Sequence, residues 1–481
     1  MKILAYCRLV AILLAIVGLA MMFPLGVALF FRETQVLAAF ALPCVLSITL
    51  GIVFLFLGKK AHLQINPRNG FPIVASFWIF TCLFGAIPFV LSGYFPSFTD
   101  AIFESVSGFT TTGASILSDV EILPNAINVW RAETHWLGGM GIVALTVALF
   151  PLIGVGGFQL IKAETTGPEK GKITPKITQT AKILWFIYVG FTILQTLLLM
   201  LFGMNFIDAI IHAFSTLGTG GFSNKNTSLA YYNSSAINWI CSIFMFLAGI
   251  NFSLYFQVFI KKGKDILHNS ELKGYVSIVA VSIFLVVFAL TPHFGNFAQA
   301  LEHGTFQVLS IISTTGFITS NYALWPSLAQ LVIFFLMFIG GCSGSTAGGI
   351  KVIRWVILSK QLKNEVGKMI HPHGIFSIRV DNRAGRKDIV FSVAAFIFLY
   401  FMLVVVTAFV ATSDGVDILS ALTSSLTMVG NIGPGFGKVS PVDNFAFYSS
   451  GVKWWFSFAM LAGRLELYTM LVFFMPTYWK K

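Results

Sequence analysis

The sequence predicts an all-α integral membrane protein in which two N-terminal transmembrane helices precede four pseudo-repeats of helix–pore loop–helix around a central pore. Three observations carry this prediction. Long stretches of the chain are apolar, the basic residues gather in connections on one side of those stretches, and a short Ser/Thr/Gly pattern recurs four times.

The composition excludes a soluble globular protein. The chain has 481 residues, of which 56% are hydrophobic and only 10% are charged, whereas soluble domains carry about 25% charged residues. Uncharged runs such as Leu9–Phe31 and Val36–Leu57 exceed the roughly 18 residues that a hydrocarbon core requires. Lys2 and Arg8 precede the first run, which is too long for the apolar region of a signal peptide. We therefore expect a spanning helix there.

Apolar runs divide the chain into ten predicted membrane spans. They lie near residues 9–32, 36–58, 70–93, 127–152, 178–203, 235–260, 273–292, 327–359, 386–412 and 448–476. If the N-terminus is cytoplasmic, 25 of the 31 Lys and Arg residues fall in cytoplasmic segments. Short cytoplasmic loops are enriched in Lys and Arg, so this imbalance predicts a multi-pass protein with both termini in the cytoplasm.

Acidic residues are concentrated on the opposite, outer side. Those that fall there are Asp100, Asp119, Glu121, Glu133, Asp414, Asp417 and Asp443. A negatively charged outer vestibule would concentrate cations at an entrance. The alternative is that these are ordinary acids of solvated loops.

Four outer connections share one pattern. In each, a mostly apolar segment of about ten to fifteen residues starts near an acid or polar residue and ends in Ser, Thr and Gly. The four endings are Ser107–Gly113, Ser215–Gly221, Ser310–Gly316 and Ser425–Gly433. A helix of about 12 residues covers roughly 18 Å, which is too short for a core of about 30 Å. Each segment should therefore enter the membrane from outside, stop midway and return as extended chain.

The four loops are predicted to meet on one axis. Non-helical backbone at that depth is tolerated only where it is buried in protein or lines water, and four hairpins around a central passage meet that condition. Ordinary Gly/Thr turns in a helical bundle would explain one such loop, but not four on the same predicted side. The predicted units are a helix pair over residues 1–69 and pore repeats over residues 70–177, 178–271, 272–384 and 385–481.

The loop tips favour a monovalent cation. Glycine permits backbone angles that turn carbonyl groups toward an axis, and rings of backbone carbonyls replace the hydration shell of potassium. Thr and Ser add hydroxyl oxygens, and no tip carries the carboxylates that divalent-cation filters use. The predicted filter residues are Thr111, Thr112, Gly113, Thr219, Gly220, Gly221, Thr314, Thr315, Gly316, Asn431, Ile432 and Gly433.

These motifs resemble the Trk/Ktr/HKT superfamily of potassium transporters, and the sequence is most similar to the bacterial Trk potassium uptake membrane subunit. The resemblance covers nearly the whole chain. It rests on Thr110–Ala114, Thr219–Ser223, Thr314–Phe317, Asn431–Gly435, Gly249–Phe252 and Gly340–Lys351. The two extra N-terminal spans resemble the Trk branch rather than the shorter Ktr branch. The fourth loop departs from the Thr-rich pattern at Asn431 and Ile432, so we expect a chemically asymmetric filter.

The resemblance implies potassium-selective, channel-like uptake across a bacterial cytoplasmic (inner) membrane, with K⁺ as the transported ion and no covalent cofactor. It also implies a homodimer with one pore per subunit and a cytosolic ring of nucleotide-binding regulatory subunits. The basic segments 153–182 and 360–388 are the expected docking surfaces, although attraction to anionic lipid would also explain their charge. A sodium- or proton-coupled potassium symporter is the alternative function, because discontinuous helices also serve transporters.

A second motif lies inside the eighth predicted span. Five glycines occur between residues 340 and 349. Since each glycine costs roughly 1 kcal/mol in a helix relative to alanine, the helix should be interrupted. The resemblance implies a mobile gate beneath the filter, formed by Gly340, Gly341, Cys342, Ser343, Gly344, Ser345, Thr346, Ala347, Gly348 and Gly349. Close helix packing through small residues is the alternative. A phosphate loop is rejected, because the adjoining Gly-Lys-Ser/Thr and a preceding strand are missing.

Arg464 lies near the middle of the last predicted span. A charged residue at that depth is costly and usually functional, and the resemblance places an arginine of this helix in the pore beneath the filter, as part of the gate. The alternative is a structural ion pair with another helix. Glu466 follows two residues later and would not share a helical face with Arg464. Lys351 and Arg354 are expected to be cytoplasmic anchors or contacts to a regulatory partner.

Nothing in the sequence predicts an enzyme. It contains no nucleophile–base pair, and its five cysteines and eight histidines show no metal-binding spacing. His135 and His212 lie in or near spans and are expected to be structural residues with satisfied hydrogen bonds. Nucleic acid is not an expected partner, because the basic residues lie in short loops without a basic face or interleaved aromatic residues.

Overall fold

The computed structural model is helical throughout most of the chain. It describes residues 2–58, 67–141, 177–260, 269–374, 376, 379–380, 383–384 and 387–479. Within these residues the strands are β1 (Arg379–Val380) and β2 (Arg383–Ala384), which form one antiparallel pair. The predicted all-α membrane fold is therefore confirmed.

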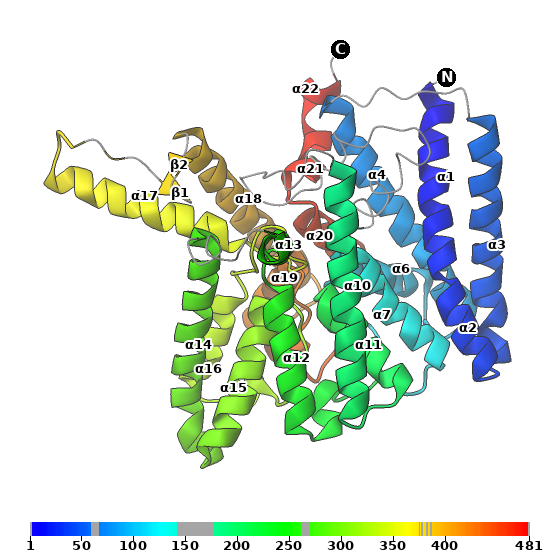
Figure 1. The fold of residues 1–481 in the computed structure, drawn as a ribbon, viewed down its shortest axis with the longest axis horizontal. Helices are drawn as coiled ribbons and strands as arrows, with labels where there is room; N and C mark the ends of the chain where they lie inside the picture. The colour runs from blue at the N-terminus through cyan, green and yellow to red at the C-terminus, as the bar shows by residue number, and fades with distance from the viewer. Residues whose placement is uncertain are drawn as a thin grey trace.

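Two N-terminal spans stand at one side of the molecule (Figure 1). The first consists of α1 (Lys2–Ala20) and α2 (Met22–Phe30), and the second is α3 (Thr34–Leu57). The Glu33 carboxylate, between the two spans, accepts hydrogen bonds from the first backbone amides of α7 (Asn125–Gly139). A carboxylate at a helix N-terminus satisfies amides that have no partner within the helix. This contact ties the N-terminal pair to the rest of the chain.

Four units of similar design follow, each with a first helix, a half-helix, a returning loop and a second helix. The first helices are α4 (Pro67–Gly85) with α5 (Ile87–Ser92), α10 (Ile177–Leu201), α14 (Ser270–Phe294) and α18 (Lys387–Thr412). The half-helices are α6 (Phe98–Phe109), α11 (Phe206–Gly218), α15 (Phe297–Ile312) and α19 (Ile418–Gly430). The second helices are α7, α12 (Ser235–Ala248), α16 (Ser327–Leu336) and α20 (Ser450–Arg464).

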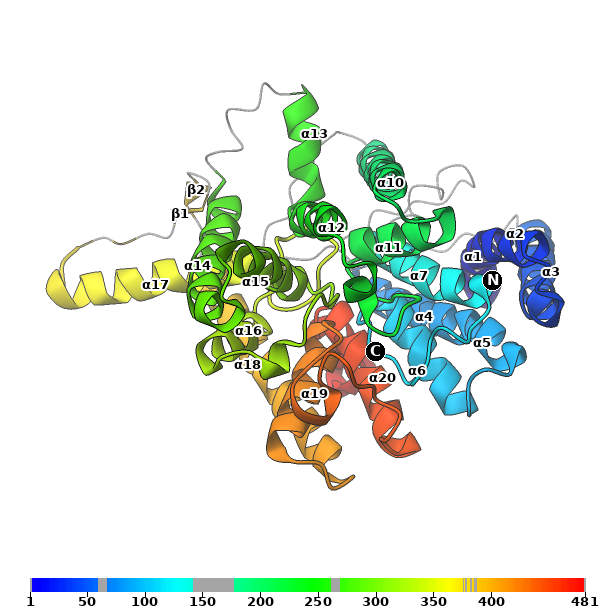
Figure 2. The ribbon, with the colours of Figure 1, turned by 90° about the horizontal axis from the view of Figure 1, so that it is seen from below.

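Further helices complete the described chain. The chain continues past the second helices as α13 (Phe252–Ile260), α17 (Val352–Ile370), α21 (Tyr468–Leu471) and α22 (Pro476–Trp479). Short 3-10 helices are η2 (Ser228–Tyr232), η4 (Tyr322–Leu324), η5 (Gly437–Val439) and η6 (Val472–Phe474). Seen along the bundle, the four half-helices lie around a common centre, with α1, α2 and α3 outside them (Figure 2).

The half-helices begin alike on one face of the bundle, here called the loop face. The caps Ser97, Asn205, Asn296 and Asp417 each accept a hydrogen bond from a backbone amide of the first turn. Such a cap satisfies one of the amides that a helix N-terminus leaves unpaired. The helices have 12, 13, 16 and 13 residues, too short to span, as predicted. The first helix of the chain begins, and the last one ends, on the opposite face (Figure 1).

The second helices are shorter than the sequence predicts. The single span predicted at 448–476 is wrong, because α20 ends at Arg464; within 327–359 the helix α16 ends at Leu336, a few residues before the glycines at which an interruption is predicted. In the third repeat, α17 then leaves the bundle sideways (Figure 1). Glycines near both breaks lower the helix propensity there: Gly340 follows α16, and Gly463 is the penultimate residue of α20.

The other two second helices are also interrupted. Between α12 and α13 the chain bends by 92°, within the predicted span 235–260. The helix α7 ends at Gly139, and the remainder of the predicted span 127–152 lies outside the described residues after residue 141. In the described part of the chain, six helices are long and apolar enough to cross a membrane, or seven if the bent pair is one span.

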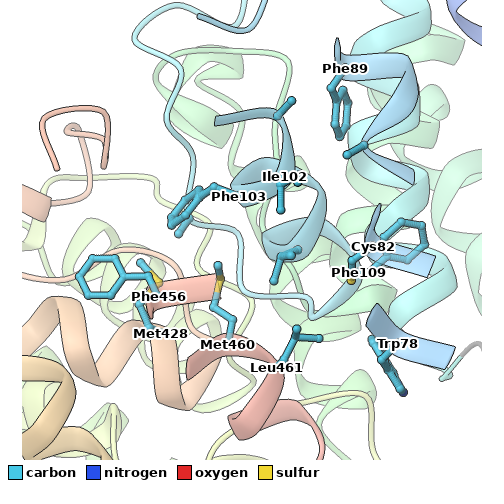
Figure 3. Close-up of a cluster of buried hydrophobic side chains, with 14 of the residues drawn as sticks. Trp78, Cys82, Phe89, Ile102, Phe103, Phe109, Met428, Phe456, Met460 and Leu461 are labelled. Carbon is cyan, nitrogen blue, oxygen red and sulfur yellow. The ribbon is translucent and has the colours of Figure 1, made fainter. Parts of the chain in front are cut away.

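A buried apolar cluster joins the first and fourth repeats (Figure 3). It contains Trp78 on α4, Phe109 on α6, Met428 on α19, and Met460 and Leu461 on α20. All five side chains are buried, and their shared packing brings the last half-helix beside the first. The first and fourth repeats therefore pack against each other, which closes the bundle of four repeats.

Two acids expected at an outer vestibule are buried instead. Asp100 is 7% exposed and forms an ion pair with Lys453, at 2.7 Å between Oδ1 and Nζ. Glu133, on α7, is 5% exposed. The vestibule and solvated-loop interpretations are both wrong for these two acids. Breaking a buried pair leaves an uncompensated charge, so the Asp100–Lys453 pair holds α6 against α20.

Candidate functional site

The four loops share one backbone conformation. Each predicted filter glycine has a left-handed backbone, with φ of 76° at Gly113, 82° at Gly221 and Gly316, and 96° at Gly433. Two residues earlier in each loop a second left-handed residue occurs, which is not glycine. These residues are Thr111, Thr219, Thr314 and Asn431, with φ between 54° and 56°.

The left-handed Thr and Asn residues are unfavourable by themselves. The conformation costs a residue with a side chain roughly 1–2 kcal/mol, and strain of this kind persists only where the surrounding structure enforces it. Its recurrence at one position in all four loops shows that the repeats share backbone geometry, including the fourth, whose residues differ. The sequence signal was the Gly that follows two residues later, and the strained position itself was not foreseen.

The loops meet in a closed ring. A side-chain carbon added to a filter glycine would lie almost on a backbone carbonyl oxygen of the next loop. The distances are 1.8 Å from Gly113 to Gly220, 2.0 Å from Gly221 to Thr315, 2.4 Å from Gly316 to Ile432 and 2.9 Å from Gly433 to Thr112. Each contact leads from one repeat to the following one, and the fourth returns to the first. The predicted filter residues form four triplets, Thr111–Gly113, Thr219–Gly221, Thr314–Gly316 and Asn431–Gly433. The ring explains why the last residue of each triplet is glycine.

Side chains also join neighbouring residues of the ring. The Thr110 and Thr112 hydroxyls lie 2.8 Å apart. The Asn431 side-chain amide donates to the Thr112 hydroxyl at 2.9 Å and to the Met460 carbonyl at 3.0 Å. Asn431 therefore links the fourth loop to the first loop and to α20. The departure from the Thr-rich pattern in the fourth loop thus has a structural use.

The electrostatics of the ring favour a cation. All four half-helices end at the ring, and the C-terminal end of a helix carries a partial negative charge. The filter residues themselves contribute carbonyl, hydroxyl and amide groups without an ionisable side chain. Uncharged oxygens with helix C-termini behind them suit a weakly hydrated monovalent ion better than a divalent one.

Residues 337–351, between α16 and α17, form a non-helical stretch called here the intramembrane segment. Its helix interruption is as predicted. The segment lies against the break in the second repeat, where the Cys342 amide donates to the Gly249 carbonyl at 2.8 Å and the Phe252 amide to the Gly344 carbonyl at 3.0 Å. It also reaches the filter, because the Gly348 amide donates to the Thr314 hydroxyl at 2.7 Å.

A buried carboxylate joins the middle of the intramembrane segment to the start of α17. One oxygen of Glu271, in the first turn of α14, accepts the Ser343 amide at 2.6 Å and the Ile353 amide at 3.2 Å. Within the segment, the buried Lys351 ammonium donates to the Ala347 carbonyl. Sequence reasoning missed Glu271; the available signal was an acid two residues past a helix cap, which normally indicates only helix-end stabilisation.

Arg464 lies between the intramembrane segment and the first repeat. Its guanidinium donates to the Thr346 carbonyl at 2.8 Å and to the last carbonyls of α7, Gly138 at 2.6 Å and Gly139 at 3.0 Å. A cation is favoured at a helix C-terminus, where carbonyls lack partners within the helix. The placement of Arg464 in a pore beneath the filter stays a prediction.

The residues around Arg464 differ from a continuous helix. The helix α20 ends at Arg464, and Glu466 and Leu467 both have left-handed backbones, with φ of 55° and 53°. The Glu466 carboxylate forms an ion pair with Arg354 at 2.6 Å. The Arg354 guanidinium also stacks over the Phe396 ring, 3.6 Å from its centroid. Arg354 is thus a buried structural contact, and the expectation of a cytoplasmic anchor or partner contact is wrong for it.

The two buried histidines differ. His212 uses both ring nitrogens, with the Asp208 carbonyl at 2.7 Å and the Ser223 hydroxyl at 3.0 Å, which confirms the structural interpretation. His135 is fully buried, but its Nε2 lacks a hydrogen-bond partner in the described structure. In the described residues no group of three or more His, Cys, Asp and Glu could hold a metal ion.

Comparisons with known proteins agree with the sequence resemblance. Residues 37–481 match the TrkH family, described as cation transport proteins. The chain is 38% identical over 99% of both sequences to the Trk system potassium uptake protein TrkH of Salmonella typhimurium. It is 37% identical over 98% of both sequences to the protein of that name from Halomonas elongata. The crystal structure of the potassium transporter TrkH from Vibrio parahaemolyticus superposes with a TM-score of 0.87, at 33% identity over the whole of both chains.

Proposed function

Because the chain belongs to the TrkH family of cation transport proteins, we propose that it is a potassium-selective, channel-like uptake protein of a bacterial cytoplasmic membrane. The closed ring of filter loops is the observation that carries the proposal. Four loops from four repeats bring uncharged oxygens together at the ends of four half-helices. Such a ring can replace the water around a monovalent cation.

The twelve filter residues are the proposed ion-binding groups. Their backbone carbonyls supply most of the oxygens, and the Thr hydroxyls support the loops from behind or from the side. The ring contacts favour carbonyls of the middle residue in each triplet, since Gly220, Thr315, Ile432 and Thr112 are the residues whose carbonyl oxygens meet the adjacent glycines. K⁺ is here the transported substrate.

The intramembrane segment and Arg464 are the proposed gate. What supports this is contact with the third filter loop, where the Gly348 amide donates to the Thr314 hydroxyl. Arg464 adds a fixed positive charge there and holds the segment through Thr346. A fixed cation raises the barrier to a permeating cation. Movement of the segment together with Arg464 would open the path.

The remaining expectations concern assembly. We propose that the protein functions as a homodimer with one pore per subunit, that both termini are cytoplasmic, and that a ring of nucleotide-binding subunits controls the gate. The division at residues 69, 177, 271 and 384 into a helix pair and four pore repeats belongs to the same proposal. Of the predicted docking segment 153–182, residues 153–176 lie outside the described residues, and the remainder forms the start of α10.

Ion flux into liposomes tests the function. Purified protein should conduct K⁺ and Rb⁺ well and Na⁺ poorly, and Gly113→Ser should abolish this preference because an added side chain meets the Gly220 carbonyl at 1.8 Å. The matched control is Gly93→Ser. Gly93 has the same φ of 76°, but nothing lies within 4 Å of an added side-chain carbon. Equal K⁺ and Na⁺ flux in the wild type would overturn the proposal, and flux that requires Na⁺ or H⁺ would favour the symporter.

A further inference from the structure

The second filter loop lacks a side chain where the other three have one. The middle residue of the triplet is Thr112, Thr315 or Ile432 in the first, third and fourth loops, but Gly220 in the second. The space beside Gly220 is filled from another repeat. A side-chain carbon added at Gly220 would lie 2.2 Å from Cγ and Nδ1 of the His135 ring.

The second loop also lacks the hydroxyl pair that supports the first and third loops. In the first and third loops the hydroxyl of the middle residue bonds to a hydroxyl two residues earlier, Thr112 to Thr110 at 2.8 Å and Thr315 to Ser313 at 2.7 Å. The corresponding positions in the second loop are Gly220 and Gly218. Because two glycines replace two hydroxyl residues, this loop has fewer restraints of its own and more backbone freedom.

The helix α7 of the first repeat supplies the missing support. The His135 ring stacks on Phe222 with centroids 4.1 Å apart, and the Phe222 amide approaches His135 Nδ1 at 3.5 Å. On its other side the Phe222 ring meets the Arg131 guanidinium, 4.2 Å from the centroid. Arg131 is in turn held by a buried ion pair with Glu104 at 2.8 Å. Two residues of α7, one turn apart, therefore clamp the chain that leaves the second loop.

The histidine backbone completes this contact. A side-chain carbon added at Gly218 would lie 2.5 Å from the His135 carbonyl oxygen. The loop from Gly218 to Phe222 therefore packs around His135. The His135 imidazole is fully buried. Since Nδ1 faces a backbone amide, the neutral ring carries its proton on Nε2, the atom that lacks a partner in the described structure. The hydrogen bonds of this histidine alone do not account for its position, whereas its volume beside Gly220 does.

We propose that His135 is a positioning residue of the filter, which holds the second loop in place and thereby sets ion selectivity. The proposal rests on the potassium function proposed above. It assigns to the first repeat a role inside the second repeat's filter loop. It also explains the loss of the Thr side chain at position 220, because the imidazole ring and a Thr side chain cannot occupy the same space.

The proposal is tested by exchanging side-chain volume between His135 and Gly220. K⁺, Rb⁺ and Na⁺ flux is measured in liposomes for wild type, His135→Ala, Gly220→Thr and the double variant. His135→Ala should lower the K⁺-to-Na⁺ flux ratio about tenfold or more, because small displacements degrade a site that depends on geometry. Gly220→Thr should lower the ratio as well, and the double variant should recover part of it, since Thr then has room.

Two further variants separate positioning from general destabilisation. His135→Phe keeps the ring but removes Nδ1, and it should retain a ratio near that of the wild type. Gly190→Thr is the control for an added side chain, because nothing lies within 4 Å of that position on α10. Unfolding midpoints are recorded for all variants, since a purely structural role would lower stability without changing the flux ratio of the folded molecules.

The possible results are distinct. A wild-type K⁺-to-Na⁺ ratio in folded His135→Ala, or in Gly220→Thr, overturns the proposal while leaving the potassium function intact. Loss of selectivity in folded His135→Phe overturns the proposal, because the volume of the ring would then not be what positions the second loop. If His135→Ala does not fold, Gly220→Thr and the double variant decide: recovery in the double variant supports the proposal, and its absence contradicts it. A wild type without ion preference removes the proposed function instead.

Discussion

The filter ring and the intramembrane segment are neighbours, yet they are held in place by different means. The ring is fixed by backbone against backbone, with one contact of the same kind in each of four repeats. The segment occurs once, and besides backbone bonds at Gly249 and Phe252 it is held by single side chains from elsewhere, above all Glu271 and Arg464. Backbone packing in a ring cannot be released one contact at a time, whereas hydrogen bonds from single side chains can. This difference suits a rigid selectivity element above a movable barrier.

The largest effect is expected where the ring is disturbed. Gly221→Ala places a methyl group 2.0 Å from the Thr315 carbonyl oxygen, at a residue with φ of 82°. Both the collision and the left-handed backbone oppose the change, so we expect selective flux to be lost. Gly295→Ala is a matched control, because its φ of 62° is also left-handed but nothing lies within 4 Å of the added carbon. Flux assays with K⁺ and Na⁺ compare the two, and preserved selectivity in Gly221→Ala would show that the ring tolerates distortion.

The next effect concerns the segment. Arg464→Ala removes three hydrogen bonds from a charged donor, and such bonds contribute about 1.5–3 kcal/mol each. If the closed arrangement depends on them, the open population should rise by about tenfold or more, since each 1.4 kcal/mol is a factor of about ten. The measurement is K⁺ flux per molecule at equal membrane abundance.

Arg464→Lys serves as the charge-conserving comparison for this prediction. Lysine keeps the positive charge but not the planar fork that reaches both Thr346 and the end of α7. An intermediate flux would show that both charge and bonding matter. Flux unchanged from wild type in Arg464→Ala would remove this residue from the gate.

The sequence predicts the repeated parts of this molecule better than the single ones. The four half-helices and filter glycines could be foreseen because glycine, caps and apolar length recur with a known physical meaning. The closed order of the ring depends on contacts between residues more than 90 positions apart, and no pattern in the sequence marks the left-handed conformation of Thr111 and its three counterparts. Glu271 and His135 were missed as site residues for the same reason. His135 acts on a loop of another repeat, and Glu271 bonds to amides 72 and 82 positions further along the chain, so the neighbouring sequence shows neither contact.

A smaller effect is expected at Glu271. Glu271→Ala leaves the amides of Ser343 and Ile353 without their acceptor, which favours rearrangement of the intramembrane segment. We expect K⁺ flux to rise by about threefold to tenfold, less than for Arg464→Ala, because two hydrogen bonds are lost rather than three. Glu271→Gln retains a carbonyl oxygen and should stay near the wild type. Wild-type flux in Glu271→Ala would show that this carboxylate does not restrain the segment.

The smallest expected effect tests how far the ring depends on its one irregular loop. Asn431→Thr restores the pattern of the other loops but removes the donor that bonds to Thr112 and to the Met460 carbonyl. The backbone contact between Gly433 and the Thr112 carbonyl does not require that side chain, so the ring should stay closed. Two neutral hydrogen bonds contribute about 1–3 kcal/mol together, which should appear as a lower unfolding midpoint and about a twofold change in the Rb⁺-to-K⁺ flux ratio. A larger loss of selectivity than in Gly221→Ala would mean that side chains, and not the backbone, hold the ring, and the contrast with the intramembrane segment would fail.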